Sequence, residues 1–268
     1  MSRVEQPGTL ALVGPGRAGT TVAAALAARG WDVVAVAGRR VDAPSTLAAA
    51  ARLGASAVEL AGSGRGADVV IIATPDGVVE TAAATLAGSV GPDALVVHLS
   101  GALGLDALSA VPGRVGALHP LQTFPSVDAG LVRLAGSWCA VAGDPEVRAI
   151  AVQLGLQPVE IADADRVRYH AAACIASNHL VALLDQVQRL APVPLEAFLP
   201  LVRATVDNVD DLGPADALTG PVARGDARTV ARHLDALSGD DRDAYRALAR
   251  LARSLSGRVD PALAELLR

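Results

Sequence analysis

Four polar residues recur at helical spacing in an alanine-rich stretch of the chain. His170, Cys174, Ser177 and Asn178 stand at offsets of four, seven and eight residues, and alanine fills most positions around them. Residues with these offsets share one face of an α-helix. A small, apolar face that carries only a few polar groups suits the lining of a site for a small polar substrate. A helix interface satisfied by hydrogen-bonded polar side chains is the alternative interpretation.

Other candidate residues fall at strand ends and in a loop. Ser100 and Gly101 follow the apolar run 94–99, and His119 stands where a short strand leaves into a loop before a proline. Ligands of α/β sheets bind at such strand ends, although His119 has turn capping as an alternative role. Arg224 lies in a glycine-flanked loop and could bind a substrate carboxylate through its guanidinium group. An ordinary surface arginine is the alternative. The nearby Asp226 is expected to be a helix N-cap.

A glycine pattern separates the first apolar run from a helical pattern. It has the form G-x-G-x-x-G and comprises Gly14, Pro15, Gly16, Arg17, Ala18 and Gly19. Between a strand and a helix, this is the fingerprint of a dinucleotide site, in which glycines permit a tight turn and close approach of a pyrophosphate. The helix N-terminus would then face the phosphates. A tight turn without a ligand is the alternative interpretation.

The second predicted strand, 31–37, is followed by Arg39 and Arg40. An NAD-binding unit carries an acidic residue at about this place, for the ribose hydroxyls. Guanidinium groups suit the 2′-phosphate of NADP instead, so the sequence predicts NADP as cofactor. A solvated arginine pair is the alternative. Thr74 and Pro75 follow the next strand, 67–73, and are expected to face the cofactor together with Ser100.

Alternation of apolar strands with helices continues to about residue 162, and only helical patterns follow. We therefore expect an α/β fold: a Rossmann-type, doubly wound, mostly parallel sheet followed by an all-helical C-terminal domain. The predicted domains are an NADP-binding domain over 1–162 and a helical substrate and dimerisation domain over 163–268. The later helices are expected over 163–190, 195–212, 226–237 and 241–255.

The composition excludes several classes of protein. With 268 residues, 51% of them apolar, the chain is long enough for a sizeable core, and its net charge of −5 argues against nucleic-acid and membrane partners. Residues 1–7 lack the apolar core of a signal peptide, so a cytoplasmic protein is expected. Cys139 and Cys174 form no metal-binding spacing and are expected to be buried thiols. All 23 basic residues are arginines, so no lysine is present to act as a general acid.

Four longer motifs carry a family resemblance. They are H-L-S-G-A at 98–102, A-L-H-P-L-Q-T-F at 117–124, Y-H-A-A-A-C-I-A-S-N at 169–178 and L-T-G-P-V-A-R-G-D at 218–226. With the glycine fingerprint, they resemble the 6-phosphogluconate, β-hydroxyacid and ketopantoate reductase superfamily. The resemblance is closest to a branch that pairs a Rossmann-like domain with a long-uncharacterised helical domain, some members of which are an alternative type of ketopantoate reductase.

The resemblance implies a catalytic lysine four residues before an asparagine on the first long helix. Asn178 matches the asparagine, whereas the lysine position holds Cys174. A thiol in an alanine-lined pocket is a poor proton donor. We therefore expect His170 to donate the proton, with His119 as the competing donor, and Asn178 to orient the carbonyl group.

The resulting expectation is an NADPH-dependent reductase of a small 2-keto acid, with ketopantoate first among the substrates. Ser100, Gly101, His119, Cys174, Ser177 and Arg224 are the candidate substrate-binding residues. Reduction of an imine, a pyrroline carboxylate or a β-hydroxyacid by the same architecture is the enzymatic alternative. A non-catalytic NADP-responsive binding protein is the alternative from another class. The small helical domain is expected to complete its apolar faces in a homodimer.

Overall fold

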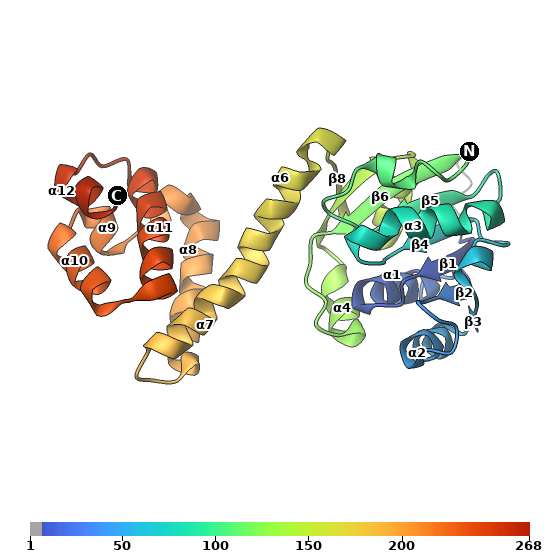
Figure 1. The fold of residues 1–268 in the computed structure, drawn as a ribbon, viewed down its shortest axis with the longest axis horizontal. Coiled ribbons are helices and arrows are strands. Elements are labelled where there is room, and N and C mark those ends of the chain that lie inside the picture. Colours follow the sequence, from blue (N-terminus) through green and yellow to red (C-terminus); the bar gives the residue numbers. More distant parts are fainter. Residues whose placement is uncertain (1–6) are drawn as a thin grey trace. The chain divides into compact units, whose positions relative to one another are not determined.

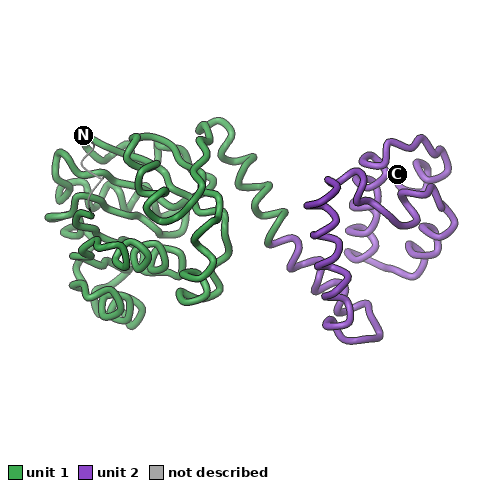
Figure 2. Tube along the Cα trace, turned by 180° about the vertical axis from the view of Figure 1, so that it is seen from behind, with its two compact units in different colours: residues 1–177 green, residues 178–268 purple. Residues whose placement is uncertain are grey.

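The chain forms two compact units, Met1–Ser177 and Asn178–Arg268 (Figures 1 and 2). The structure is a computed structural model and describes residues 7–268. The prediction that no signal peptide is present rests on residues 1–7, of which residues 1–6 lie outside the described part. Over residues 7–268, no helix is both long enough and apolar enough to cross a bilayer. The last strand ends at Glu160, near the expected domain boundary, whereas the two units divide within the helical segment that follows.

The described part of the first unit contains one eight-stranded sheet with the order β3-β2-β1-β4-β5-β6-β7-β8. All neighbouring strands are parallel except β6 and β7. The strand order reverses between β1 and β4, which is where doubly wound sheets bind ligands. The predicted Rossmann-type sheet is confirmed. Its strands are β1 (Thr9–Val13), β2 (Asp32–Ala37), β3 (Ser56–Ala57), β4 (Val69–Ile72), β5 (Leu95–His98), β6 (Arg114–Pro120), β7 (Trp138–Gly143) and β8 (Gln157–Glu160).

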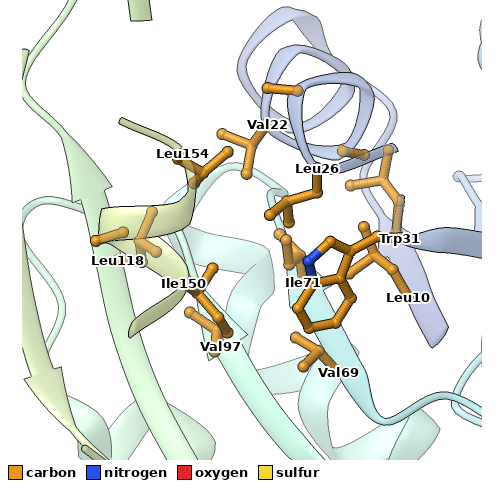
Figure 3. Close-up of a cluster of buried hydrophobic side chains, with 14 of the residues drawn as sticks. Leu10, Val22, Leu26, Trp31, Val69, Ile71, Val97, Leu118, Ile150 and Leu154 are labelled. Atoms are coloured by element: carbon orange, nitrogen blue, oxygen red, sulfur yellow. The ribbon is translucent and has the colours of Figure 1, made fainter. Parts of the chain in front are cut away.

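Helices cover both faces of this sheet. Since successive residues of a strand point to opposite faces, each strand contributes side chains to a core on either side. Along β4, Val69 and Ile71 join the core cluster drawn in Figure 3, whereas Val70 and Ile72 join a second cluster. The uninterrupted apolar strands of the sequence are explained by this two-sided burial. The helices of the unit are α1 (Arg17–Ala27), α2 (Pro44–Leu53), α3 (Asp76–Leu86), α4 (Val127–Leu134), α5 (Glu146–Gln153) and α6 (Asp163–Cys174).

Helix α6 continues through a π-helical turn, Ile175–His179, into α7 (Leu180–Leu190). The other helices of the second unit are α8 (Leu199–Ala217), α9 (Gly220–Arg224), α10 (Ala227–Ala236), α11 (Gly239–Ser256) and α12 (Pro261–Leu266). Asp226 caps α10 as expected, since its Oδ1 accepts a hydrogen bond from the Thr229 amide at 3.0 Å. The backbone of α8 leaves helical geometry at Gly213, directly after the predicted helix end.

The buried core of the second unit is small. It is formed by α9, α10, α11 and the C-terminal segment, through Val222, Val230, Leu234, Ala249, Leu263 and Leu267. Neither α7 nor α8 contributes a buried residue. Apolar side chains of α8 are instead exposed, so this helix is amphipathic without burying its apolar face in its own unit.

Candidate active site

The glycine turn between β1 and α1 brings backbone against backbone. Gly14 has a φ of 87°, and a Cβ on it would lie 2.7 Å from the Ala73 carbonyl. A Cβ on Gly19 would lie 2.6 Å from the Ala73 Cβ. Both positions therefore require glycine, which explains the tight turn and the close packing of α1 on the sheet. Around Gly16, by contrast, no atom of the described residues beyond the adjoining backbone and chain neighbours lies within 4 Å of such a Cβ, so this position is open to a ligand.

Helix α1 begins at Arg17, and Gly16 occupies its N-cap position without a side-chain hydrogen bond. The amide groups of the first turn, which includes Ala18, and the positive end of the helix dipole are suited to a phosphate. Pro15 lies beside Gly38, at the end of β2. The Arg17 guanidinium donates to the Pro125 carbonyl at 3.4 Å.

The arginine pair after β2 is exposed, but its two members differ. Arg40 forms a two-pronged ion pair with Asp42, with Nε–Oδ1 and Nη2–Oδ2 distances of 2.8 and 2.6 Å. This contact raises the pKa of Arg40 and lowers that of Asp42. Arg39 forms no ion pair with any described residue. Arg39 is therefore the more available guanidinium for a 2′-phosphate.

Two further expected cofactor residues follow β4. The Thr74 hydroxyl oxygen is buried and has no hydrogen-bond partner among the described residues, and Pro75 occupies the N-cap position of α3. Both lie at the carboxyl edge of the sheet, beside the strand reversal. A buried hydroxyl without a partner is an uncommon feature that is satisfied by a water or a ligand group.

His119 and His170 meet around Gly101 in the first unit. Their ring centroids are 5.5 Å apart, with the rings at 83° to one another. A Cβ on Gly101 would collide with His170 Nδ1 and lie 2.9 Å from His119 Nε2. Glycine thus lets the turn after β5 enter between the two imidazoles. The structure brings together the two donors that the sequence offered as competitors.

Tyr169 belongs to the same cluster and was not predicted from the sequence. Its hydroxyl oxygen lies 2.9 Å from His119 Nδ1. Burial raises the pKa of Tyr169 to about 12, so the hydroxyl stays protonated at neutral pH. Burial, with the adjacent His170 and Arg166, lowers the pKa of His119 to about 4. A Tyr169 hydroxyl that donates to Nδ1 leaves the proton of neutral His119 on Nε2, which faces Gly101.

Arg166 and His98 are two further buried residues that the sequence reasoning missed as site residues. Both are 0% exposed. Arg166 Nη2 donates to the Ser100 carbonyl at 2.7 Å, and the Ser100 amide donates to His98 Nδ1 at 3.2 Å. Burial and the charge of Arg166 lower the pKa of His98 to about 4. The spacing of four between Arg166 and His170 is the signal by which the sequence places both on one helical face.

The Ser100 hydroxyl stabilises the turn in which it lies. Its oxygen accepts hydrogen bonds from the amides of Ala102 and Leu103, at 3.2 and 3.1 Å. Such local bonds fix a turn at a strand end. Ser100 therefore shapes the loop that carries Gly101, and its hydroxyl hydrogen is left as a donor for a ligand.

The remaining predicted residues are distributed over both units. Cys174 lies one turn from His170, with Sγ 3.7 Å from Nε2, and is partly buried, whereas Cys139 is fully buried. Ser177 is the last residue of the first unit; Asn178 and Arg224 belong to the second. Ser177 and Asn178 lie in the π-helical turn, where each residue advances by a smaller angle than in an α-helix, so their directions differ from those that regular helical spacing gives. Their roles stay predictions.

Comparison with known proteins matches the two halves of the chain separately. A family model described as a Rossmann-like domain matches residues 4–125, and one described as a domain of unknown function, DUF2520, matches residues 138–252. The chain is thus similar to a Rossmann-like domain over residues 4–125 and to DUF2520 over residues 138–252. No curated protein matches.

Solved structures share this fold over nearly the whole chain. A proposed NADP oxidoreductase from Bacteroides fragilis is 25% identical, with a TM-score of 0.78 over 93% of this chain and 99% of that one. Protein TM1727 from Thermotoga maritima is 26% identical, with a TM-score of 0.73 over 92% and 98% of the two chains. Pyrroline carboxylate reductase from Plasmodium falciparum, solved with NADP bound, is 12% identical, with a TM-score of 0.59 over 92% and 98%. These likenesses fit the superfamily that the motifs indicate and do not distinguish its ketopantoate reductase branch.

The glycine turn gives a matched pair of variants. Gly16→Ala meets open space, so we expect unchanged thermal stability and an affinity for NADPH, the expected cofactor, reduced at least tenfold, or about 1.4 kcal/mol. Gly19→Ala meets Ala73 and the Gly14 carbonyl, so we expect a loss of stability of about 1–3 kcal/mol from overpacking. Calorimetry and fluorescence titration with NADPH check both. The same loss of stability in the two variants would contradict the open position at Gly16.

Proposed function

We propose that this chain is an NADP-dependent oxidoreductase that reduces a small 2-keto acid, with ketopantoate as the first substrate to test. The observation that carries the proposal is that a glycine turn suited to a pyrophosphate and a pair of imidazoles lie at the carboxyl edge of the parallel part, β3 to β6, of one sheet. The full-length similarity to an NADP oxidoreductase proposed in B. fragilis supports the same class. The ketopantoate branch rests on the sequence motifs alone.

The residues that would hold NADP are those of the glycine turn, the first turn of α1 and Arg39. When bound, the nicotinamide supplies a hydride to the substrate carbon. The chain must supply the proton that the carbonyl oxygen takes up, and it has no lysine for this task. We assign the proton to His170 Nδ1, which has no hydrogen-bond partner among the described residues. His119 is neutral at pH 7 and orients the site through its bond with Tyr169.

Reduction of a cyclic imine is the second candidate. An iminium ion already carries the proton on nitrogen and requires less proton donation from the protein. The lack of lysine favours this alternative, and the fold of pyrroline carboxylate reductase is compatible with it. A panel of 2-keto acids and cyclic imines, with NADPH oxidation as the measurement, separates the two; no oxidation with any substrate, but tight NADPH binding, would indicate a binding protein.

Cofactor selection is expected to depend on Arg39. We expect NADPH to bind at least tenfold more tightly than NADH, a difference of about 1.4 kcal/mol. Arg39→Ala should remove most of this preference, because the Arg39 guanidinium forms no ion pair within residues 7–268. Arg40→Ala is the matched control and should have a smaller effect, because Arg40 is held by Asp42. Equal affinities of the parent protein for the two nucleotides, measured by fluorescence titration, would refute the assignment.

The proton donor is tested by steady-state kinetics on the best substrate of the panel. His170→Ala should lower kcat by about 10²–10⁴ and leave the affinity for NADPH unchanged, since general acid catalysis has this magnitude. Asn178→Ala should lower kcat in the same direction if it orients the carbonyl. Loss of turnover in His119→Ala, with His170→Ala fully active, would assign the donor to the strand end instead.

We propose further that a second copy of the chain covers the apolar face of α8. Leu201, Val206, Val209 and Leu212 are each at least 39% exposed and fall within an arc of about 140° on the helix. An amphipathic helix stabilises a protein when this face is buried. Pairing of two identical faces about a two-fold axis buries both at once.

Light scattering at micromolar concentration should give twice the chain mass of 27.0 kDa. Val206→Asp should yield a monomer, because it places a charge in the apolar face. Ala204→Asp, which adds the same charge on the other side of α8, should remain dimeric. A monomeric mass of the parent at this concentration would contradict the proposal.

A further inference from the structure

Arg166 is a fully buried cation with little compensation. It is 0% exposed, and only Nη2 has a hydrogen-bond partner, the Ser100 carbonyl at 2.7 Å. Nε and Nη1 are buried without a partner among the described residues, and no carboxylate of the described chain forms an ion pair with it. A guanidinium cannot lose its proton at ordinary pH. The site therefore contains a fixed, incompletely solvated positive charge, which is costly to maintain.

Arg166 and Asp163, both on α6, each form a hydrogen bond with the loop after β5. Arg166 binds the Ser100 carbonyl, and one turn earlier Asp163 Oδ2 accepts a hydrogen bond from the Leu105 amide at 3.0 Å. The first turn of α6 thus fixes both ends of the segment 100–105. Because Gly101 lies between these two anchors, its position between the imidazoles is set by α6 as well as by the sheet.

The fixed charge also acts on the imidazoles. The groups that act on His119 are its ring neighbours His170 and Tyr169 on α6 and, through their charges, Arg166 on α6, Asp76 on α3 and His98 on β5. Cys139 on β7 interacts with the His119 backbone. Burial disfavours a proton on both His98 and His119. Arg166 adds to this effect at His98, and His170 followed by Arg166 adds to it at His119, whereas Asp76 favours a proton on each. The net effect keeps His98 and His119 neutral, since the pKa of each is lowered to about 4. His170 is the third imidazole of this cluster and lies next to His119.

We propose that Arg166 is a positioning residue: it locks the Ser100–Gly101 turn between His119 and His170, and its fixed charge opposes a second positive charge on His119. The assignment of His170 as the donor rests on the proposed function. The locked turn and the neutral state of His119 do not, and they are measurable in the protein without cofactor or substrate.

The test uses the small number of histidines. The full chain has five, so the imidazole Cε1–Hε1 signals are assigned by single His→Gln variants and followed by NMR against pH. In the parent, we expect the signals of His98 and His119 to show no titration between pH 5.5 and 8. Titration of either one near pH 6.5 in the parent would overturn the proposal without any Arg166 variant.

Variants at Arg166 separate charge from geometry. Arg166→Met removes the charge, and the midpoint of the His119 titration should rise by about one pH unit. Arg166→Lys keeps the charge and should leave His119 neutral, while a single ammonium group reproduces the bond to Ser100 less well. Arg168→Met, an exposed position on the same helix, is the matched control and should change neither. An unchanged His119 titration in a folded Arg166→Met protein would overturn the electrostatic part.

Kinetics on a substrate that the parent reduces complete the test. Both Arg166 variants should lower kcat at least tenfold with unchanged NADPH affinity, and Arg168→Met should be fully active. Full activity in Arg166→Lys and Arg166→Met would overturn the positioning role. If the parent reduces no substrate of the panel but its His98 and His119 signals behave as expected, the proposed function fails and the neutral state of these imidazoles still holds.

Discussion

Close approach of backbone at the carboxyl edge of the sheet is the constraint on which the first unit depends. Gly14 and Gly19 permit α1 to lie against Ala73 at the end of β4, and Gly101 permits the turn after β5 to lie against two imidazoles. Because the strands from β3 to β6 are parallel, these contacts collect at one edge. A side chain larger than hydrogen at any of the three glycines would force apart elements that the two-sided core holds in place.

The electrostatics of this edge differ from those of a site built around a lysine. A lysine would be both a mobile charge and a proton source, whereas Arg166 is a charge that cannot deliver a proton. In the proposed function these two roles belong to different side chains: a buried guanidinium sets the field, and an imidazole carries the proton. Burial and this field, with His170 acting as well on His119, lower the pKa of His98 and of His119 to about 4, so these two side chains act as neutral hydrogen-bonding groups at physiological pH.

The helical unit has a different balance of burial. Its core consists of a few apolar residues from α9 to the C-terminal segment, and the apolar side chains of α7 and α8 remain at least partly exposed. A unit of this size gains little from its own core. Additional burial against another surface is therefore the physical route by which these helices would be stabilised.

The sequence by itself determined the fold class. Uninterrupted apolar runs identified the strands, a 3.6-residue period identified the helices, and the glycine pattern identified the turn, because each depends on local geometry and on which face is buried. It also named His119 and His170. Only the tertiary structure decided that these two residues, 51 positions apart, share a site with Tyr169, His98 and Arg166. It also showed the π-helical turn over Ile175–His179, because a change from i→i+4 to i→i+5 hydrogen bonding leaves no clear mark in the sequence pattern. The buried charge of Arg166 was hidden for a similar reason: an arginine in a first helical turn is ordinarily solvated, and its burial depends on the distant loop after β5 that folds over it.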